Sequence, residues 1–420
     1  MSVRDVPPVS RTVPALAALG LAAAVGTPAA LPARADEVVD RPATGAVVLQ
    51  GRGFGHGRGM SQWGAYGAAS SGVSWPRILD FYYPGTVRTT TGTSTIKVWI
   101  SGDSDGDTSL LPAPGLTVGF GATRRVLPAG TGYRRWRAFA SGGHVVVQYL
   151  DVAAKWRPYP LPRTTDVAFT TRTGLLRLVL PSGSLQELRG GVHTVVRNGK
   201  AQTVLHSSME SYLRGVVPAE MPSSWHTEAL AAQSVAARTY AASYRARQRA
   251  RGGFYDICDT IACQVFKGVA RYSSSGRTRT PSEQVRSTAA IAKTTGVVLR
   301  TSAASNASLV VTEFSASNGG YTVAGAASYQ IAKADPYDAK MRNPNSDWRV
   351  TVPLRRLEAP LGVGALRSVQ VVGRDGLGPL GGRVTRVRLA GTARSVEVSG
   401  TKMRALLGLR SDRFRIVATG

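Results

Sequence analysis

Short apolar runs separated by Gly and Pro turns fill the chain between Ile96 and about Val204. Runs of β-branched and aromatic residues bounded by such turns are typical of β-strands. The sequence therefore predicts a β-rich segment without an obvious internal repeat. Its clearest strands are Ile96–Ile100, Leu116–Gly119, His144–Tyr149, Leu175–Leu180 and His193–Arg197.

The period of the apolar positions changes to a helical one between Ser207 and Arg251. Several residues of an Ala-rich run share one face at a spacing of three or four: Leu230, Gln233, Ala237, Tyr240 and Tyr244. This spacing predicts a long helix over Glu228–Tyr244, for which Ser223 or Ser224 is a candidate N-cap. A shorter helix is expected just before it, at Met209–Arg214.

Both flanks of this helical centre mix strands and helices. Before the β-rich segment we expect a strand at Val47–Gln50, a Gly-rich loop at Gly51–Gly59, and helices at Met60–Ser70 and Trp75–Tyr82. After the centre we expect a helix at Ser282–Thr294 and strands at Gly296–Arg300, Leu309–Ser315 and within Arg349–Ile416. The fold class is α+β: a mixed β-rich domain around a central long helix, with an additional β-rich segment inserted.

The chain has 420 residues and a formal net charge of +27, carried mostly by arginine. Such a surface attracts polyanions, either nucleic acid, anionic lipid or the anionic polymers of a bacterial wall. Only Arg245–Arg251 is densely basic, and it lacks the interleaved aromatic residues of a single-strand binder. We therefore expect no specific nucleic-acid partner, and the basic run is also what a solvated helix end looks like.

The first 35 residues have the pattern of a Sec-type signal peptide. Arg4 and Arg11 precede the apolar run Val13–Val25, and a small-x-small cleavage pattern ends at Ala35, before Asp36. The apolar run is too short to span a bilayer comfortably. The expected location is therefore secreted or cell-wall associated, and an uncleaved membrane anchor is the alternative.

Two cysteines, Cys258 and Cys263, are separated by four residues. In an oxidising compartment this spacing favours a local disulfide bond. Zinc would require further thiolate or imidazole ligands, and no His lies nearby in the sequence. The disulfide is favoured over the metal, and we expect neither a metal nor a cofactor.

Glu220 is the strongest candidate for chemistry. It stands between Pro218 and Pro222 among apolar neighbours, which disfavour the charged form of a carboxyl group. The two prolines stiffen the backbone that carries it. A Glu that stays protonated near neutral pH is suited to act as a general acid on a glycosidic bond. The alternative is a helix cap or an ordinary surface charge.

The segment Tyr212–Tyr240 resembles the signature of the SpoIID/LytB family, the stage II sporulation protein D and amidase-enhancer group of bacterial cell-wall proteins. Further segments that match this family are Cys258–Phe266, Thr312–Gly320, Ala334–Asp338 with Trp348, and Arg404–Ser411. The resemblance implies a peptidoglycan lytic transglycosylase with Glu220 as its catalytic acid.

Gly51–Ala65 and Ile78–Thr86 resemble the element that usually closes the domain in this family, yet here they come first. The order suggests a circular permutation, which is tolerated when the two ends of a domain lie close together. We therefore predict that Val47–Gln50 lies near Phe414–Val417. The expected domains are the signal peptide 1–35, the displaced element 45–87, a β-rich segment 95–186 and a SpoIID/LytB-like domain 190–420.

Seven further residues are candidates for substrate binding: His56, Ser61, Gln62, Gln233, Arg238, Ser317 and Asn318. His56 is exposed on the Gly-rich loop in this interpretation, and it either lines a groove or supports the loop. Arg238 suits a carboxylate of the glycan because its guanidinium is planar, but an ordinary ion pair is the alternative. Ser317 and Asn318 either contact N-acetyl groups or form a turn.

The expected function is cleavage of the bond between N-acetylmuramic acid and N-acetylglucosamine, with one Glu as acid and base. The rival is a non-catalytic module that binds glycan and enhances a cell-wall amidase. A structural wall protein is a third alternative, in which residues 96–186 contact partners. The expected partners are peptidoglycan glycan strands, anionic cell-wall polymers and, in the rival interpretation, an amidase. Whether the protein acts in sporulation does not follow from the sequence.

Overall fold

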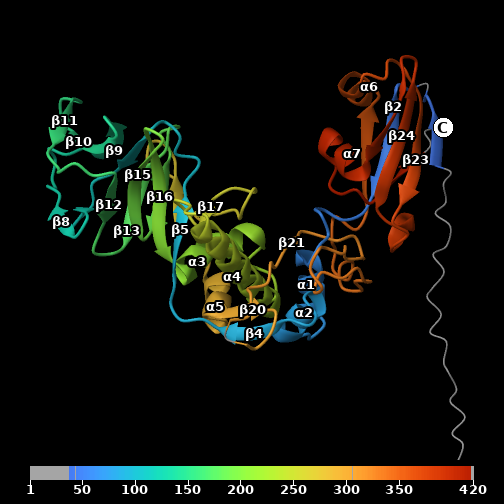
Figure 1. The fold of residues 1–420 in the computed structure, drawn as a ribbon, viewed down its shortest axis with the longest axis horizontal. Coiled ribbons are helices and arrows are strands. Elements are labelled where there is room, and N and C mark those ends of the chain that lie inside the picture. Colours follow the sequence, from blue (N-terminus) through green and yellow to red (C-terminus); the bar gives the residue numbers. More distant parts are fainter. Residues whose placement is uncertain (1–36, 43, 305, 418–420) are drawn as a thin grey trace, which may run out of the picture.

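The structure is a computed structural model that describes residues 37–42, 44–304 and 306–417. The predicted signal peptide at residues 1–35 lies outside these described residues. Figure 1 shows a β-sheet lobe, a helical centre and a third lobe in which the first and last described strands meet. No helix in the described ranges is long and apolar enough to cross a membrane. Helices and strands in mixed sheets confirm the α+β class.

The sandwich lobe consists of residues 95–208 and 257–281, folded into two sheets. Their strand orders are β17-β5-β16-β15-β12-β7-β8 and β11-β10-β9-β6-β13-β14-β18-β19. The strands are β5 (Thr95–Trp99), β6 (Asp107–Leu110), β7 (Thr117–Phe120), β8 (Thr123–Val126), β9 (Arg135–Ser141), β10 (His144–Leu150), β11 (Trp156–Tyr159), β12 (Asp166–Thr170), β13 (Leu175–Val179), β14 (Leu185–Arg189), β15 (Gly191–Arg197), β16 (Lys200–Ser208), β17 (Ile257–Cys258), β18 (Ala270–Tyr272) and β19 (Arg279–Pro281).

Alternation of buried and solvent-facing residues explains this lobe. In β5, Ile96 and Val98 are fully buried while their neighbours face outward, as the two-residue period of a strand requires. A domain boundary was expected between residues 186 and 190, but both sheets continue across it. Strand β12, before this boundary, pairs with β15, after it, and β14, which spans the boundary, pairs with the later strand β18. The segment 95–186 is therefore continuous with the strands that follow it.

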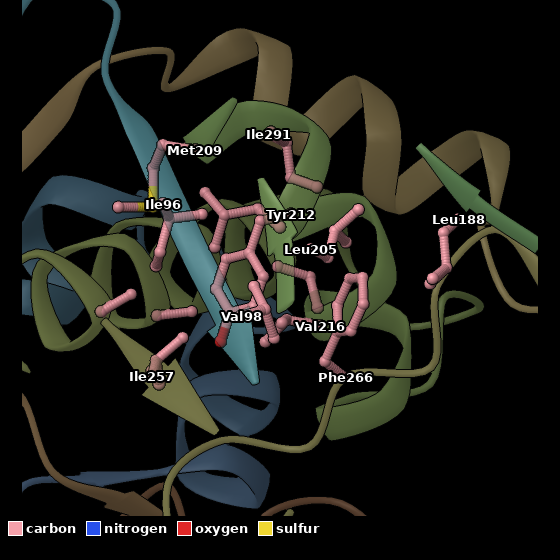
Figure 2. Packing of buried hydrophobic residues seen from close by; sticks show 14 of the residues in the cluster. Ile96, Val98, Leu188, Leu205, Met209, Tyr212, Val216, Ile257, Phe266 and Ile291 are labelled. Carbon is pink, nitrogen blue, oxygen red and sulfur yellow. The ribbon is translucent and has the colours of Figure 1, made fainter. Parts of the chain in front are cut away.

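The helical centre lies beneath this lobe (Figure 1). Its helices are α1 (Gln62–Ala69), α2 (Trp75–Tyr82), α3 (Met209–Glu220), α4 (Thr227–Ala250) and α5 (Val285–Lys293), with the short strands β3 (Met60–Ser61), β4 (Val87–Thr90), β20 (Val297–Arg300) and β21 (Phe314–Ser315). Figure 2 shows Tyr212 of α3 among Ile96, Val98, Leu205, Val216 and Phe266. This cluster joins the helical centre to the sandwich lobe in one apolar core.

Two helix boundaries differ from the expectation. Helix α3 continues past Arg214 and through Pro218, and ends only at Glu220. The N-cap of α4 is His226, whose side chain accepts from the Glu228 N–H, and neither Ser223 nor Ser224 caps it. Local capping preference is weak compared with the packing of an Ala-rich helix that is buried over most of its length.

The terminal lobe is built from both ends of the described chain and has its own apolar core. Its sheets have the orders β1-β23-β24-β25 and β22-β2-β26. The elements are β1 (Glu37–Asp40), β2 (Ala46–Gly51), β22 (Trp348–Pro353), α6 (Arg355–Leu361), β23 (Leu366–Arg374), η1 (Pro379–Gly381), β24 (Val384–Gly391), β25 (Ser395–Ser399), α7 (Gly400–Leu407) and β26 (Phe414–Val417).

Strand β2 lies between β22 and β26, so an early strand completes a sheet made of late ones. Val48 is opposite Val417, and Gly51 is opposite Phe414. The predicted proximity of Val47–Gln50 to Phe414–Val417 is thus confirmed. Circular permutation itself stays an interpretation of this pairing.

Candidate functional site

A surface cavity of about 410 Å³ lies where the Gly-rich loop, the end of α3 and the start of β21 meet. It is lined by Phe54, Gly55, His56, Gln62, Glu220, Tyr240, Ile261, Ala262, Cys263, Gln264, Val265, Glu313, Phe314, Ser315 and Ala316. Three residues proposed from the sequence, His56, Gln62 and Glu220, therefore share one cavity. His56 and Gln62 belong to one segment of the chain, and Glu220 meets them only through folding.

Glu220 is the last residue of α3, and the backbone leaves the helix in an extended conformation at Met221. Burial raises the pKa of its carboxyl above the ordinary value of 4.5, although a hydrogen bond from the Val265 N–H, Gln62 and the charge of Lys267 act in the opposite direction. The C-terminal end of a helix carries partial negative charge, which also disfavours a carboxylate there. The site thus favours a protonated Glu220 at a higher pH than an exposed glutamate.

The carboxyl group of Glu220 has few protein partners. The Val265 N–H donates to its Oε1 over 3.4 Å, which is a long hydrogen bond. Gln62 lines the same cavity and lies close enough to the Glu220 carboxyl to lower its pKa, although the buried Nε2 of Gln62 makes no hydrogen bond of good geometry within the described residues. A carboxyl group that is not locked by an ion pair can exchange a proton with a ligand in the cavity.

The Gly-rich loop brings His56 to the cavity by close backbone packing. Gly53, Gly55, Gly57 and Gly59 all have positive φ, between 64° and 113°. A Cβ at Gly59 would lie 2.0 Å from the Glu313 carbonyl oxygen, so no larger residue fits there. The alternate glycines are therefore required by both the conformation and the proximity of the neighbouring segments.

His56 is neutral in this environment. Burial, followed by the charge of Arg58, lowers its pKa to about 4. The Arg58 N–H donates to His56 Nδ1 over 3.0 Å, and this assigns the ring proton to Nε2. The cavity consequently contains an uncharged imidazole with one N–H donor.

A second carboxylate, Glu313, lines the same cavity and was not singled out by the sequence analysis. Arg58 binds it through two hydrogen bonds of 2.8 and 2.9 Å, and Gln330 Nε2 donates to it over 2.6 Å. Burial works to raise the pKa of Glu313, but the hydrogen bonds and charge of Arg58 outweigh it and lower the pKa. The two carboxyl groups therefore differ: Glu313 is ionised and held, whereas Glu220 is not paired.

Apolar side chains complete the cavity wall. The rings of Tyr240 and Phe314 lie 6.5 Å apart, and the side chains of Phe54 and Ile261 are 47% and 92% exposed. Ile261 is carried by the loop between Cys258 and Cys263, which form a disulfide bond. The expected disulfide is confirmed, and both thiols are used by it. Aromatic faces beside polar groups are suited to binding sugar rings.

Ser61, Ser317 and Asn318 do not line the cavity; all three are fully buried. Ser61 and Ser317 both donate to the carboxylate of Asp338, and Asn318 Nδ2 donates to Asp335 over 2.7 Å. Ser61 also caps helix α1. These residues therefore fix the Gly-rich loop and the segment after β21, and in this structure they cannot reach a ligand.

Gln233 and Arg238 also lie away from the cavity, on the buried faces of α4. Arg238 is 1% exposed and binds Glu210 of α3 through hydrogen bonds of 2.9 and 2.7 Å. The amide atoms of Gln233 have no partner among the described residues. The alternative of a structural ion pair, left open for Arg238, is the one that the geometry supports.

Comparisons with known proteins agree with this architecture. The family model described as "SpoIID: Stage II sporulation protein" matches residues 197–300. The chain therefore contains a SpoIID-family domain, as its motifs indicated. The matched range includes Glu220 and the disulfide but neither His56 nor Glu313, which other parts of the chain contribute to the cavity.

Individual relatives carry names from the same family. The chain is 36% identical over 152 residues to an amidase enhancer of Bacillus subtilis, which covers 35% of this chain and 17% of the relative. It is 29% identical over 224 residues to stage II sporulation protein D of Bacillus subtilis, covering 51% of this chain and 61% of that protein. The protein of the same name from Bacillus amyloliquefaciens is 30% identical over 215 residues, 49% of this chain and 59% of its own. The chain thus spans between 17% and 61% of the length of these relatives.

Proposed function

We propose that the protein is exported and acts on peptidoglycan glycan strands as a lytic transglycosylase, with Glu220 as its acid and base. The observation that carries this proposal is the unpaired Glu220 carboxyl, whose pKa is raised by burial, inside a cavity of about 410 Å³ lined by aromatic and polar groups. The similarity to proteins named for sporulation and for amidase enhancement supports a role at the cell wall.

In the first step, protonated Glu220 donates its proton to the glycosidic oxygen as the bond from C1 of N-acetylmuramic acid breaks. The resulting carboxylate then accepts the proton of the C6 hydroxyl of the same sugar. The C6 oxygen attacks C1, and a 1,6-anhydro ring closes without water. Neutral His56 and the amide of Gln62, which lies beside Glu220, are suited to donating N–H bonds to the sugars during these steps.

The arrangement of the two carboxylates favours this one-acid route. A hydrolase needs a second carboxylate that is free to act as base or nucleophile. Both oxygens of Glu313 already accept from Arg58, and one also accepts from Gln330. Glu313 is therefore suited to holding Arg58 and His56 in place, and Glu220 is left as the one cavity carboxyl able to exchange a proton.

The test is analysis of the products released from purified glycan strands by mass spectrometry. Wild type should yield anhydro ends, and Glu220→Gln, which keeps size and polarity, should fold normally and yield none. Ser224→Ala, at an exposed position shortly after Glu220, serves as a matched control with unchanged yield. Reducing ends would indicate a hydrolase, and equal yields from Glu220→Gln would contradict the proposal.

A non-catalytic role is the second candidate, favoured by the 36% identity to a protein named amidase enhancer. In that case the cavity binds glycan and positions a separate amidase. Incubation with glycan alone and then with an amidase separates the two functions. Release of products only in the second mixture would support the enhancer.

A further inference from the structure

A second open cavity, of about 470 Å³, lies on the sandwich lobe. We call it the aromatic platform, and it is lined by Trp99, Arg197, Asn198, Lys200, Gln202, Phe254 and Tyr255. The ring of Trp99 lies 5.4 Å from that of Tyr255 and 6.2 Å from that of Phe254. All three rings are only partly buried, so part of each aromatic surface is accessible to a ligand.

Two cations stand at the edge of these rings. Asn198 and Gly199 have positive φ values of 50° and 74° and form a two-residue hairpin, so that Arg197 and Lys200 are directly opposite each other. Like charges in this position destabilise a hairpin. Both side chains are exposed, and no described carboxylate forms an ion pair with either. The Arg197 guanidinium lies 5.9 Å from the centre of the Phe254 ring.

The platform is connected to the Glu220 cavity through the disulfide loop. Cys258 is the ladder partner of Trp99 in the parallel pair of β17 and β5. From Cys258 the chain forms the disulfide-closed loop, whose residues Ile261–Cys263 line the Glu220 cavity together with the two residues that follow the loop, Gln264 and Val265. Asp259 anchors this loop to the end of β5, since it accepts from the Ser101 hydroxyl over 2.6 Å. One rigid loop therefore separates the two cavities.

We propose that the aromatic platform binds a carboxylate-bearing sugar of the same glycan strand that enters the Glu220 cavity. The aromatic rings contact the apolar face of a sugar, while Arg197 and Lys200 bind its carboxylate. The inference rests on the proposed function for the identity of the polymer. Nucleic acid would satisfy the same rings and cations, but the connection to the Glu220 cavity favours glycan.

The experiment measures binding of the full chain in a Glu220→Gln background, so that cleavage plays no part. The probes are peptide-free glycan strands with free lactyl carboxylates, and the same strands after conversion of the carboxylates to methyl amides. The double variant Arg197→Gln, Lys200→Gln should bind the charged strands about tenfold more weakly and the amidated strands as before. Trp99→Ala, checked for folding by circular dichroism, should weaken binding of both by about tenfold.

The matched control is Arg124→Gln, Arg163→Gln, which removes two exposed arginines from the same lobe and should leave binding unchanged. Polyglycerol phosphate and oligo-dT serve as competing polyanions. Equal binding of charged strands by wild type and the double variant would overturn the proposal. Tighter binding of either competitor that depends on Arg197 and Lys200 would overturn the assignment to glycan. Absence of anhydro products from the wild type, with platform-dependent binding intact, would overturn only the proposed catalysis.

Discussion

Substitution of Arg238 by methionine separates a structural role of this residue from a role in binding glycan. Methionine replaces the apolar stem of the side chain and fits an apolar interior, but it removes the guanidinium with all five N–H donors. Arg238 is 1% exposed and joins three elements, since it binds Glu210 of α3 and donates to the carbonyl oxygens of Val297 and Ile291. We expect the variant to lose stability and to keep its affinity for glycan.

The size of the loss in stability depends on the polar groups that no longer have Arg238 as a partner. Breaking a buried ion pair costs about 3–5 kcal/mol when the remaining charge stays buried. The Glu210 side chain is 29% exposed and keeps a hydrogen bond from the Gly296 N–H, so water and this donor reduce the cost. The two carbonyl groups lose contacts of 3.2 and 3.4 Å, which are weak. The free energy of unfolding should therefore fall by about 3 kcal/mol.

Urea unfolding followed by tryptophan fluorescence measures this change, and titration with glycan strands measures affinity on the folded variant. Arg247→Met is the matched control, because Arg247 is an exposed residue of the same helix and its loss should cost less than about 0.5 kcal/mol. Arg238→Lys should fall between wild type and Arg238→Met. Unchanged stability together with lost affinity would refute the reasoning and return Arg238 to the binding site.

Three further predictions concern pH and the disulfide. Because burial raises the pKa of Glu220, product release should decline with rising pH along a limb above the ordinary value of 4.5. The charge of Lys267 lowers this pKa, so Lys267→Met should move the limb to higher pH in a pH–rate profile, and a downward move would contradict the assignment. Burial, then His193, lowers the pKa of His206 to about 4, so the folded state binds fewer protons than the unfolded state between pH 4 and 6.5. Compared with His206→Gln, wild type should therefore lose stability as the pH falls through this window in urea titrations, and a constant difference would argue against it. Replacement of Cys258 and Cys263 by serine should lower the free energy of unfolding by about 2 kcal/mol for so short a loop, and should weaken glycan binding in calorimetry.

The sequence predicted the elements of this fold better than their packing. Helix α2 has the expected bounds, and the period of apolar residues located α4. The proximity of β2 and β26 followed from the order of the motifs. The division at residues 186–190 did not appear as a break, because strand pairing between distant segments is decided by the whole sheet and not by local composition.

The candidate site shows the same difference between local and long-range information. Glu220 was found from its apolar neighbours, and His56 and Gln62 from the Gly-rich segment, and the structure places all three around one cavity. The local sequence around Ser61, Ser317 and Asn318 suggested substrate binding equally well. In the structure these three side chains are buried and donate hydrogen bonds to the carboxylates of Asp335 and Asp338. Glu313 was missed because its partner Arg58 is about 250 positions away, and no local pattern marks such a pair.

The insertion of β2 between β22 and β26 has a consequence for biogenesis. While the chain emerges from a ribosome or a translocation pore, β2 appears early and must wait for nearly the entire polypeptide before its neighbours exist. The helical centre and the sandwich lobe need no residue beyond about 320 for their main pairings, and can mature first. Until β22 and then β26 have been made, the edges of β2 that pair with them are unpaired, which makes this segment a natural client of a holding chaperone.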